Sequence, residues 1–66
     1  MEKFIIVSND EKIYVRIEFN RVKNMISTTV LKNKATRFFS KNNAEKFLNT
    51  KIPSVVRDKY SVVKLD

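Results

Sequence analysis

The chain has 66 residues, 42% of them hydrophobic and 32% charged, so it has room for one small core and a single domain, residues 1–66. It contains no His, Cys or Gly, which excludes zinc fingers, thiolate nucleophiles, Ser-His-Asp triads and the glycine-rich loops that bind nucleotide phosphates. Fourteen Lys and Arg residues against seven Asp and Glu residues give a net charge of +7, which favours polyanionic partners.

Catalysis and membrane insertion are both disfavoured by the residue pattern. The acidic residues are scattered without the Asp-x-Asp spacing of a metal site, so we expect a non-enzymatic protein with no metal and no cofactor. The longest apolar run, residues 4–7, is far shorter than the roughly 20 residues that span a bilayer. No signal peptide precedes it, and we therefore expect a cytoplasmic protein that does not bind a membrane.

The first half of the chain has the period-two pattern of strands. Residues 3–8 are apolar on both faces, which predicts a central strand covered on both sides. Residues 12–19 alternate, which predicts a buried face and a solvated face. The buried face holds Ile13, Val15, Ile17 and Phe19, and the solvated face holds Tyr14, Arg16 and Glu18. Residues 25–31 are rich in β-branched side chains and predict a third strand that pairs with the second.

Turns in a chain without glycine have few ways to adopt a positive φ. Asn and Asp tolerate the left-handed region better than other residues that carry a Cβ. We therefore expect the positive-φ positions at asparagines near the predicted turns: Asn9, Asn20, Asn24 and Asn33.

The second half of the chain changes to helical periodicity. Ser40 is a candidate N-cap for a helix over residues 41–50, which ends before Pro53. Its apolar stripe comprises Ala44, Phe47, Leu48 and Ile52. Residues 54–59 fit either a short helical turn or a loop, and residues 60–65 predict a fourth strand.

These segments predict an α+β fold in two layers. A three-stranded antiparallel sheet, extended by the C-terminal fourth strand, packs on one helix in the order β-β-β-α-β. If the helix returns the chain, the fourth strand lies parallel to the first through a right-handed crossover.

Positive charge is concentrated in the middle of the chain, where no acidic residue occurs between Glu18 and Glu45. The cations of this stretch are Arg21, Lys23, Lys32, Lys34, Arg37 and Lys41. Two interpretations remain open. The run is a phosphate-binding surface, or it reflects the Lys and Asn codons of an AT-rich genome.

Residues 38–48, FFSKNNAEKFL, following three strand-like segments, resemble the arm-type DNA-binding domain of phage and conjugative-transposon integrases. That resemblance implies that the exposed sheet face enters the major groove. The implied contact residues are Tyr14, Arg16 and Glu18, together with Thr28 or its neighbours Ser27 and Thr29. The same segment widened to residues 34–48, together with the closing YSVVKL, also resembles small phage proteins of AT-rich Gram-positive bacteria, which have no agreed activity.

Structural roles compete with binding at several of these positions. Tyr14 on a solvated strand face is typical of cross-strand packing, and Arg16 has an ion-pair partner in Glu18 two residues along the same face. Of the adjacent Phe38 and Phe39, we expect one ring to be buried and one to be partly exposed. An exposed ring beside Arg37 would mark a partner surface.

Two functions follow from the sequence. The first is a small basic protein of a phage or mobile element that binds nucleic acid, with duplex DNA favoured over RNA. Its candidate binding residues are Tyr14, Arg16, Arg21, Lys23, Thr28, Lys32, Lys34, Arg37 and Lys41. The alternative is a phage-encoded inhibitor or modulator that binds an acidic surface of a host protein, such as a defence nuclease targeted by an anti-CRISPR protein. Exposed sheet edges would also permit a homodimer.

Overall fold

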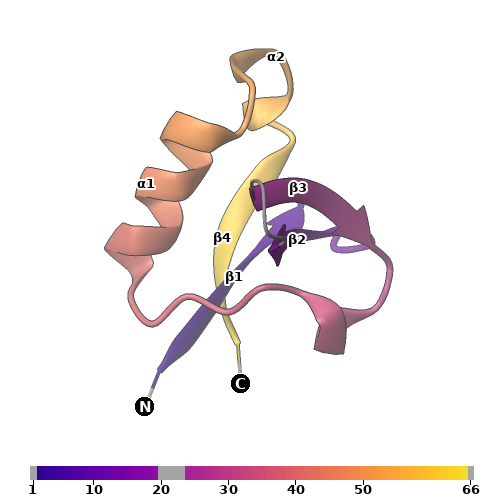
Figure 1. The fold of residues 1–66 in the computed structure, drawn as a ribbon, viewed down its shortest axis with the longest axis vertical. Helices are drawn as coiled ribbons and strands as arrows, with labels where there is room; N and C mark the ends of the chain where they lie inside the picture. Colours follow the sequence, from indigo (N-terminus) through magenta and orange to yellow (C-terminus); the bar gives the residue numbers. More distant parts are fainter. Residues whose placement is uncertain (1, 20–23, 66) are drawn as a thin grey trace.

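The structure is a computed structural model that describes residues 2–19 and 24–65 and shows an α+β fold with a four-stranded sheet and one main helix (Figure 1). Its elements are β1 (Lys3–Ser8), β2 (Tyr14–Phe19), β3 (Asn24–Thr29), the 3-10 turn η1 (Lys32–Lys34), α1 (Lys41–Lys51), α2 (Ser54–Arg57) and β4 (Tyr60–Leu65). The sheet order is β3-β2-β1-β4, and every neighbouring pair is antiparallel. The predicted α+β class and the C-terminal fourth strand are confirmed.

The predicted parallel orientation of β4 is wrong, because β4 pairs antiparallel with β1 over its whole length, from Lys3 opposite Leu65 to Ser8 opposite Tyr60. The loop after β3, and not α1, carries the chain back to the end of the sheet where β1 begins. Phe38 in this loop forms a bridge with Phe4 near the start of β1. Helix α1 therefore begins at the end of the sheet where β1 starts and runs toward the end where β1 stops. Strand β4, which follows α1 and α2, must then run opposite to β1 (Figure 1).

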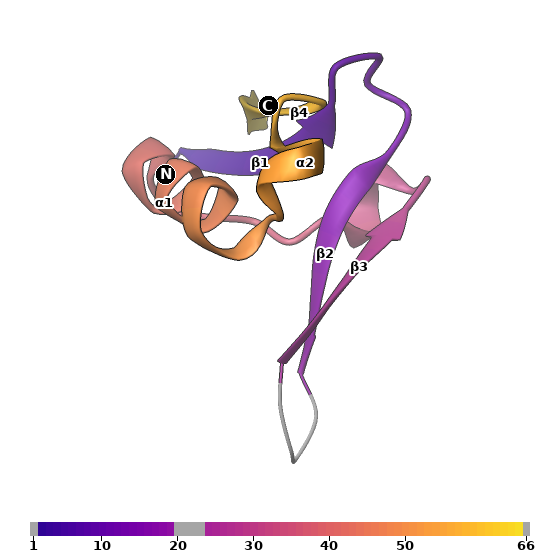
Figure 2. The ribbon, with the colours of Figure 1, turned by 90° about the horizontal axis from the view of Figure 1, so that it is seen from above.

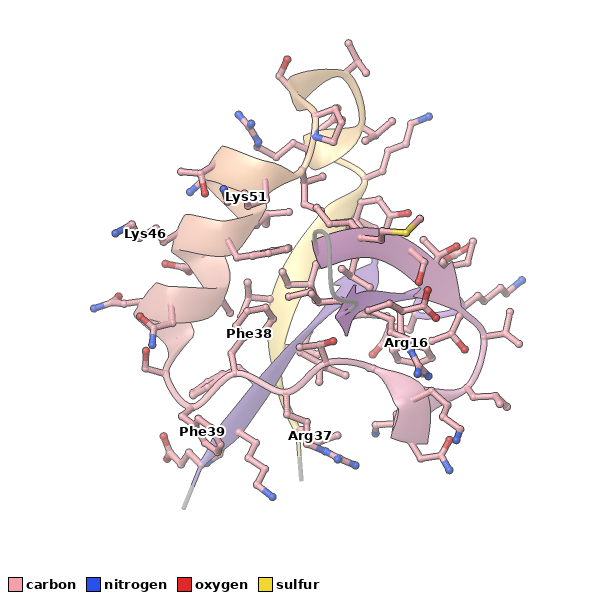
Figure 3. All side chains as sticks on the ribbon, in the orientation of Figure 1. Arg16, Arg37, Phe38, Phe39, Lys46 and Lys51 are labelled. Carbon is pink, nitrogen blue, oxygen red and sulfur yellow. The ribbon has the colours of Figure 1, made fainter. Side chains whose placement is uncertain are left out.

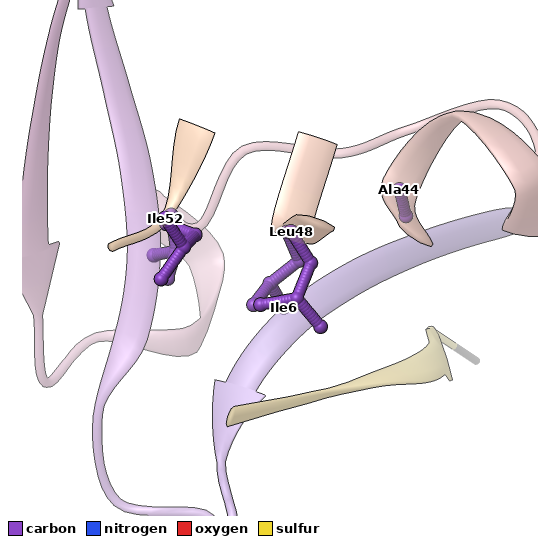
Figure 4. Packing of buried hydrophobic residues seen from close by; sticks show 5 residues of the cluster. Ile6, Ala44, Leu48 and Ile52 are labelled. Carbon is purple, nitrogen blue, oxygen red and sulfur yellow. The ribbon is translucent and has the colours of Figure 1, made fainter. Parts of the chain in front are cut away.

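Helix α1 covers one face of the sheet and forms the core with it. Ser40 is the N-cap, as predicted, because its side chain accepts a hydrogen bond from the backbone N–H of Asn43 at 3.1 Å. The buried cluster comprises Ile6, Val15, Ala44, Leu48 and Ile52 (Figure 4). Phe47, from the predicted apolar stripe, is only partly buried and packs against the edge of this cluster.

The end of α1 is held by the next element. Ile52 is extended before Pro53, as the pre-proline restriction requires. Residues 54–59, whose sequence fits either a short helical turn or a loop, contain the single helical turn α2, which carries Arg57. The Arg57 guanidinium donates hydrogen bonds to the backbone carbonyls of Leu48 at 3.1 Å and Ile52 at 2.9 Å. These bonds satisfy carbonyl groups that have no partner within α1.

Strand β1 is buried on both faces, as its sequence predicts. Ile6 faces α1, whereas Ile5 and Val7 point to the opposite face, and each of the three is exposed by 1% or less. On that opposite face Ile5 lies across from Val63 of β4. The continuous apolar run thus marks the central position of β1 in the sheet.

Strands β1 and β2 pair at one point only, Val7 with Tyr14, and then diverge. Figure 2 shows the β2–β3 ribbon turning away from β1 and β4 beyond this corner. The segment after η1 fills the gap. Thr36 bonds to β2, and the backbone of Phe38 exchanges two hydrogen bonds of 2.8 Å with Phe4 of β1.

The turn between β1 and β2 corrects the prediction about asparagine. Among the described residues, the positive φ falls on Glu11, at 59°, and not on Asn9, Asn24 or Asn33, while the predicted Asn20 lies outside those residues. Asn9 has a different role, because its side-chain amide donates to the Asp58 carbonyl at 2.7 Å. This bond ties the turn to the chain just before β4.

The same turn delays the start of β2, which begins at Tyr14 and not at residue 12. The Ser8 hydroxyl accepts hydrogen bonds from the backbone N–H groups of Lys12 and Ile13. These groups are therefore engaged within the turn. Ile13 is consequently exposed, although the alternation predicts it on the buried face.

Candidate nucleic-acid interface

The predicted solvated face of β2 lies opposite α1. Val15 belongs to the α1 core, so its neighbours Tyr14, Arg16 and Glu18 point to the other face. Tyr14 and Arg16 are half-buried there, and Glu18 is exposed. The strand therefore brings these three side chains together, as the sequence predicts.

Bonds within the molecule already engage all three of these side chains. The Arg16 Nε atom lies 3.5 Å from the Glu18 carboxylate, and both side chains remain substantially exposed. The Tyr14 hydroxyl donates to the Glu11 carbonyl at 3.4 Å. An exposed ion pair contributes little to stability, about 0–1 kcal/mol, but it offsets the charge that Arg16 offers to an anion.

The assignment of Thr28 to this face is wrong. Thr28 lies across from Val15, so its side chain is on the α1 side of the ribbon. The neighbours Ser27 and Thr29 lie opposite Arg16 and Tyr14 and share their face. Strand β3 runs from Asn24 to Thr29 and not over residues 25–31. The exact pairing register decides which of three adjacent hydroxyl residues points outward, and the sequence does not specify it.

A second set of cations lies beside β2, on the segment that fills the gap between β1 and β2. The backbone N–H of Thr36 donates to the Val15 carbonyl at 3.2 Å, and the Ile17 N–H donates to the Thr36 hydroxyl at 2.7 Å. These two bonds hold the segment from η1 onward along the edge of β2. Lys32, Lys34 and Arg37 are exposed on this segment.

We call Arg16, Lys32, Lys34 and Arg37 the η1 basic surface. Figure 3 shows Arg16 and Arg37 on the side of the molecule that holds η1, whereas α1 with Lys46 and Lys51 lies on the other side. Of these four cations only Arg16 forms an ion pair with a described residue. Lys32, Lys34 and Arg37 belong to the predicted basic stretch, whereas Arg16 comes from β2 and is brought beside this segment by the hydrogen bonds of Thr36.

The predicted binding residue Lys41 lies apart from this surface. Lys41 is the first residue of α1, and its ammonium group lies 3.9 Å from the Glu45 carboxylate. Helix α1 and η1 occupy opposite sides of the molecule in Figures 1 and 2. Arg21 and Lys23 lie outside the described residues.

The two adjacent phenylalanines separate, as expected. Phe38 turns toward α1, where its ring centroid lies 5.5 Å from that of Phe47. Phe39 is 66% exposed and follows Arg37 by two positions. Near the Phe38–Phe47 pair, Lys46 and Lys51 line an open groove of about 260 Å³ on α1. This groove is not identifiable from the sequence, because Lys46 falls on the solvent-facing side of the predicted helix and Lys51 lies beyond its predicted end at residue 50.

A larger open pocket of about 550 Å³ lies between the β1–β2 turn and the start of β4, with Asp10 and Lys59 in its lining. Hydrogen bonds from the Ser8 hydroxyl and the Lys12 backbone hold the pKa of the Asp10 carboxyl below its usual value. These bonds join neighbouring residues of one turn. The pocket thus follows from the turn geometry, and we assign it no ligand.

Comparisons with protein-family models, curated proteins and solved structures find no match to this chain. Among residues 2–19 and 24–65, no three acidic side chains are grouped so that they could hold a metal ion. Neither described helix is long and apolar enough to cross a membrane. The η1 basic surface is therefore interpreted from its own geometry.

Proposed function

We propose that this protein binds nucleic acid, duplex DNA in preference to RNA, through the η1 basic surface. The observation that carries the proposal is the placement of Lys32, Lys34 and Arg37, which are exposed and form no ion pair with a described residue. Arg16 adds a fourth cation from β2. Unpaired lysines and arginines on one surface supply the phosphate contacts that dominate nucleic-acid affinity.

The proposed contacts are mainly to phosphate groups. Lysine is a point charge on a flexible stem and suits phosphate contacts without base preference. The guanidinium of Arg16 is held by Glu18 at 3.5 Å, and so it is less available for the bidentate guanine contact that would read sequence. The protein is thus expected to bind with modest sequence specificity. The resemblance of residues 38–48 to arm-type integrase domains stays a prediction, and the proposal does not depend on it.

The test compares two charge-matched triple variants by fluorescence anisotropy with labelled duplex DNA, single-stranded DNA and duplex RNA. One variant replaces Lys32, Lys34 and Arg37 with Ala. The control replaces Lys46, Lys51 and Lys59, which are also exposed but lie on α1 and before β4. The first variant is expected to lose at least tenfold in affinity for duplex DNA at low salt, and the control to lose less than threefold. Equal losses, or no binding by the parent, would overturn the proposal.

A second candidate function is the binding of a host protein, and the exposure of Phe39 favours it. An aromatic ring that is 66% exposed is available as an interface anchor, and Phe39 lies two positions after Arg37 on the same segment. In a pull-down from nuclease-treated host lysate, this function predicts a stoichiometric protein partner that Phe39→Ala removes. If nucleic-acid binding is the function, nuclease treatment removes the partners and Phe39→Ala has no effect on protein capture.

A further inference from the structure

Strand β3 is an edge strand, and its free side can be identified from the hydrogen bonds of β2. The Val15 carbonyl and the Ile17 N–H both point to Thr36, away from β3. Because backbone groups alternate in direction along an antiparallel strand, the residues opposite these two, Thr28 and Ile26, direct their own N–H and C=O groups outward. Asn24 is two residues before Ile26, and its backbone groups have the same direction.

The free edge of β3 lacks the features that usually prevent strand pairing. Its sequence, NMISTT, contains no charged residue and no proline. Ile26 is 44% exposed and Met25 is exposed beside it. Natural sheets commonly protect edges with lysine or proline, and the other edge strand, β4, does carry Lys64. An uncharged, partly apolar edge therefore favours pairing with another strand.

We propose that β3 pairs antiparallel with β3 of a second copy of this chain, with the two-fold axis at Ile26. In this register Asn24 meets Thr28 of the second copy, Ile26 meets itself, and every outward backbone group between them gains a partner. A shift of the axis to Ser27 would leave Asn24 without a partner in the strand. The register centred on Ile26 thus forms more hydrogen bonds than the register centred on Ser27.

The side chains also suit a second copy better than an unrelated strand. Ile17 of β2 lies across from Ile26, and both side chains are on the α1 side of the ribbon. Symmetric pairing extends this pair into a row of four isoleucines across the dimer axis. No charged residue lies on β3, so the pairing brings no like charges into opposition. The result is a continuous sheet of eight strands.

A contact through one pair of strands buries less surface than a standard protein interface, so the dimer is expected to dissociate in the micromolar range. Sedimentation equilibrium from about 1 µM to about 1 mM protein covers that range. The measurement uses high salt to screen the net charge of +7 and contains no nucleic acid, so its result is independent of the proposed function. The parent is expected to shift from 7.8 kDa to twice that mass.

Proline substitutions on the two edges give a matched test. Thr28→Pro removes an outward N–H from the β3 edge and retains all β2–β3 bonds, and it is expected to weaken the dimer at least tenfold. Lys64→Pro is the control on β4. The backbone of Phe4, opposite Lys64, bonds to Phe38, so the Lys64 N–H also points outward. This variant should dimerise like the parent.

A third variant, Ile26→Lys, places two like charges at the axis and is also expected to be monomeric. If circular dichroism shows that Thr28→Pro does not fold, the mass of the Ile26→Lys variant tests the proposed dimer in its place. A parent that remains at 7.8 kDa at the highest concentration overturns the proposal and leaves the edge to a strand of another protein. Dimerisation of folded Thr28→Pro or Ile26→Lys with parental affinity, or loss of the dimer in Lys64→Pro, also overturns it.

Discussion

Glu11 occupies a φ of 59° in the tight turn between β1 and β2. A residue with a Cβ is strained in this region by about 1–2 kcal/mol, and a sequence without glycine has no strain-free residue to place there. The surrounding bonds hold the turn in position. The Tyr14 hydroxyl donates to the Glu11 carbonyl, and the Ser8 hydroxyl accepts from two following N–H groups. Side-chain hydrogen bonds thus impose a backbone conformation that the residue itself does not favour.

Replacing Glu11 with glycine should therefore stabilise the protein. Relief of the left-handed strain exceeds the added entropy of the unfolded chain, so we expect Glu11→Gly to raise the free energy of unfolding by about 0.5–1 kcal/mol. Urea denaturation followed by circular dichroism measures the change. Lys12→Gly is the control at the next position, where φ is not positive, and should lower stability. Equal destabilisation by both variants would refute the role assigned to the turn.

At the scale of elements, the segment after η1 determines how the candidate interface is built. The Thr36 hydroxyl accepts a hydrogen bond from the Ile17 N–H at 2.7 Å, and the Thr36 N–H donates to the Val15 carbonyl. Phe38 then bonds to Phe4 of β1. One extended segment thus connects the two diverging strands and carries Lys34 and Arg37 on either side of the connection. The position of the basic residues depends on these few bonds.

Removal of the Thr36 hydroxyl should weaken both stability and binding. Thr36→Val preserves the shape of the side chain but leaves the partly buried Ile17 N–H without a partner, at a cost of about 1–3 kcal/mol. The loosened segment is also expected to reduce affinity for duplex DNA about threefold to tenfold in the anisotropy assay. Thr36→Ser retains the hydroxyl and should restore both properties. An unchanged free energy of unfolding in Thr36→Val would contradict this account of the segment.

Local patterns in the sequence predict most elements but not their arrangement. The alternation around Val15, the N-cap at Ser40 and the stripe through Leu48 depend on neighbouring residues, and these predictions are confirmed. The direction of β4 and the bond between Thr36 and Ile17 depend on contacts between distant segments. No periodicity encodes such contacts. The predicted direction of β4 was therefore wrong, and the four cations of the η1 basic surface were predicted only within a larger set that also included Thr28 and Lys41.

For the molecule as a whole, the distribution of charge matters more than its sum. Ion pairs join Arg16 to Glu18, Lys41 to Glu45 and Lys64 to Glu2 at the surface. The cations of η1 and Arg37 have no such partner among the described residues. The β2–β3 ribbon and α1 project to different sides (Figure 2), which separates the η1 basic surface from the lysines of the helix. A polyanion should therefore approach from the η1 side.

The salt dependence of duplex DNA binding tests this account most directly. Each phosphate contact that a cation makes contributes about −0.9 to the slope of log K against log salt concentration. Replacement of Lys32, Lys34 and Arg37 with Ala should make the slope less negative by up to about 2.7, whereas the triple replacement of Lys46, Lys51 and Lys59 should leave it unchanged. Equal changes of slope in both variants, or an unchanged slope in the first, would contradict the assignment of binding to the η1 basic surface.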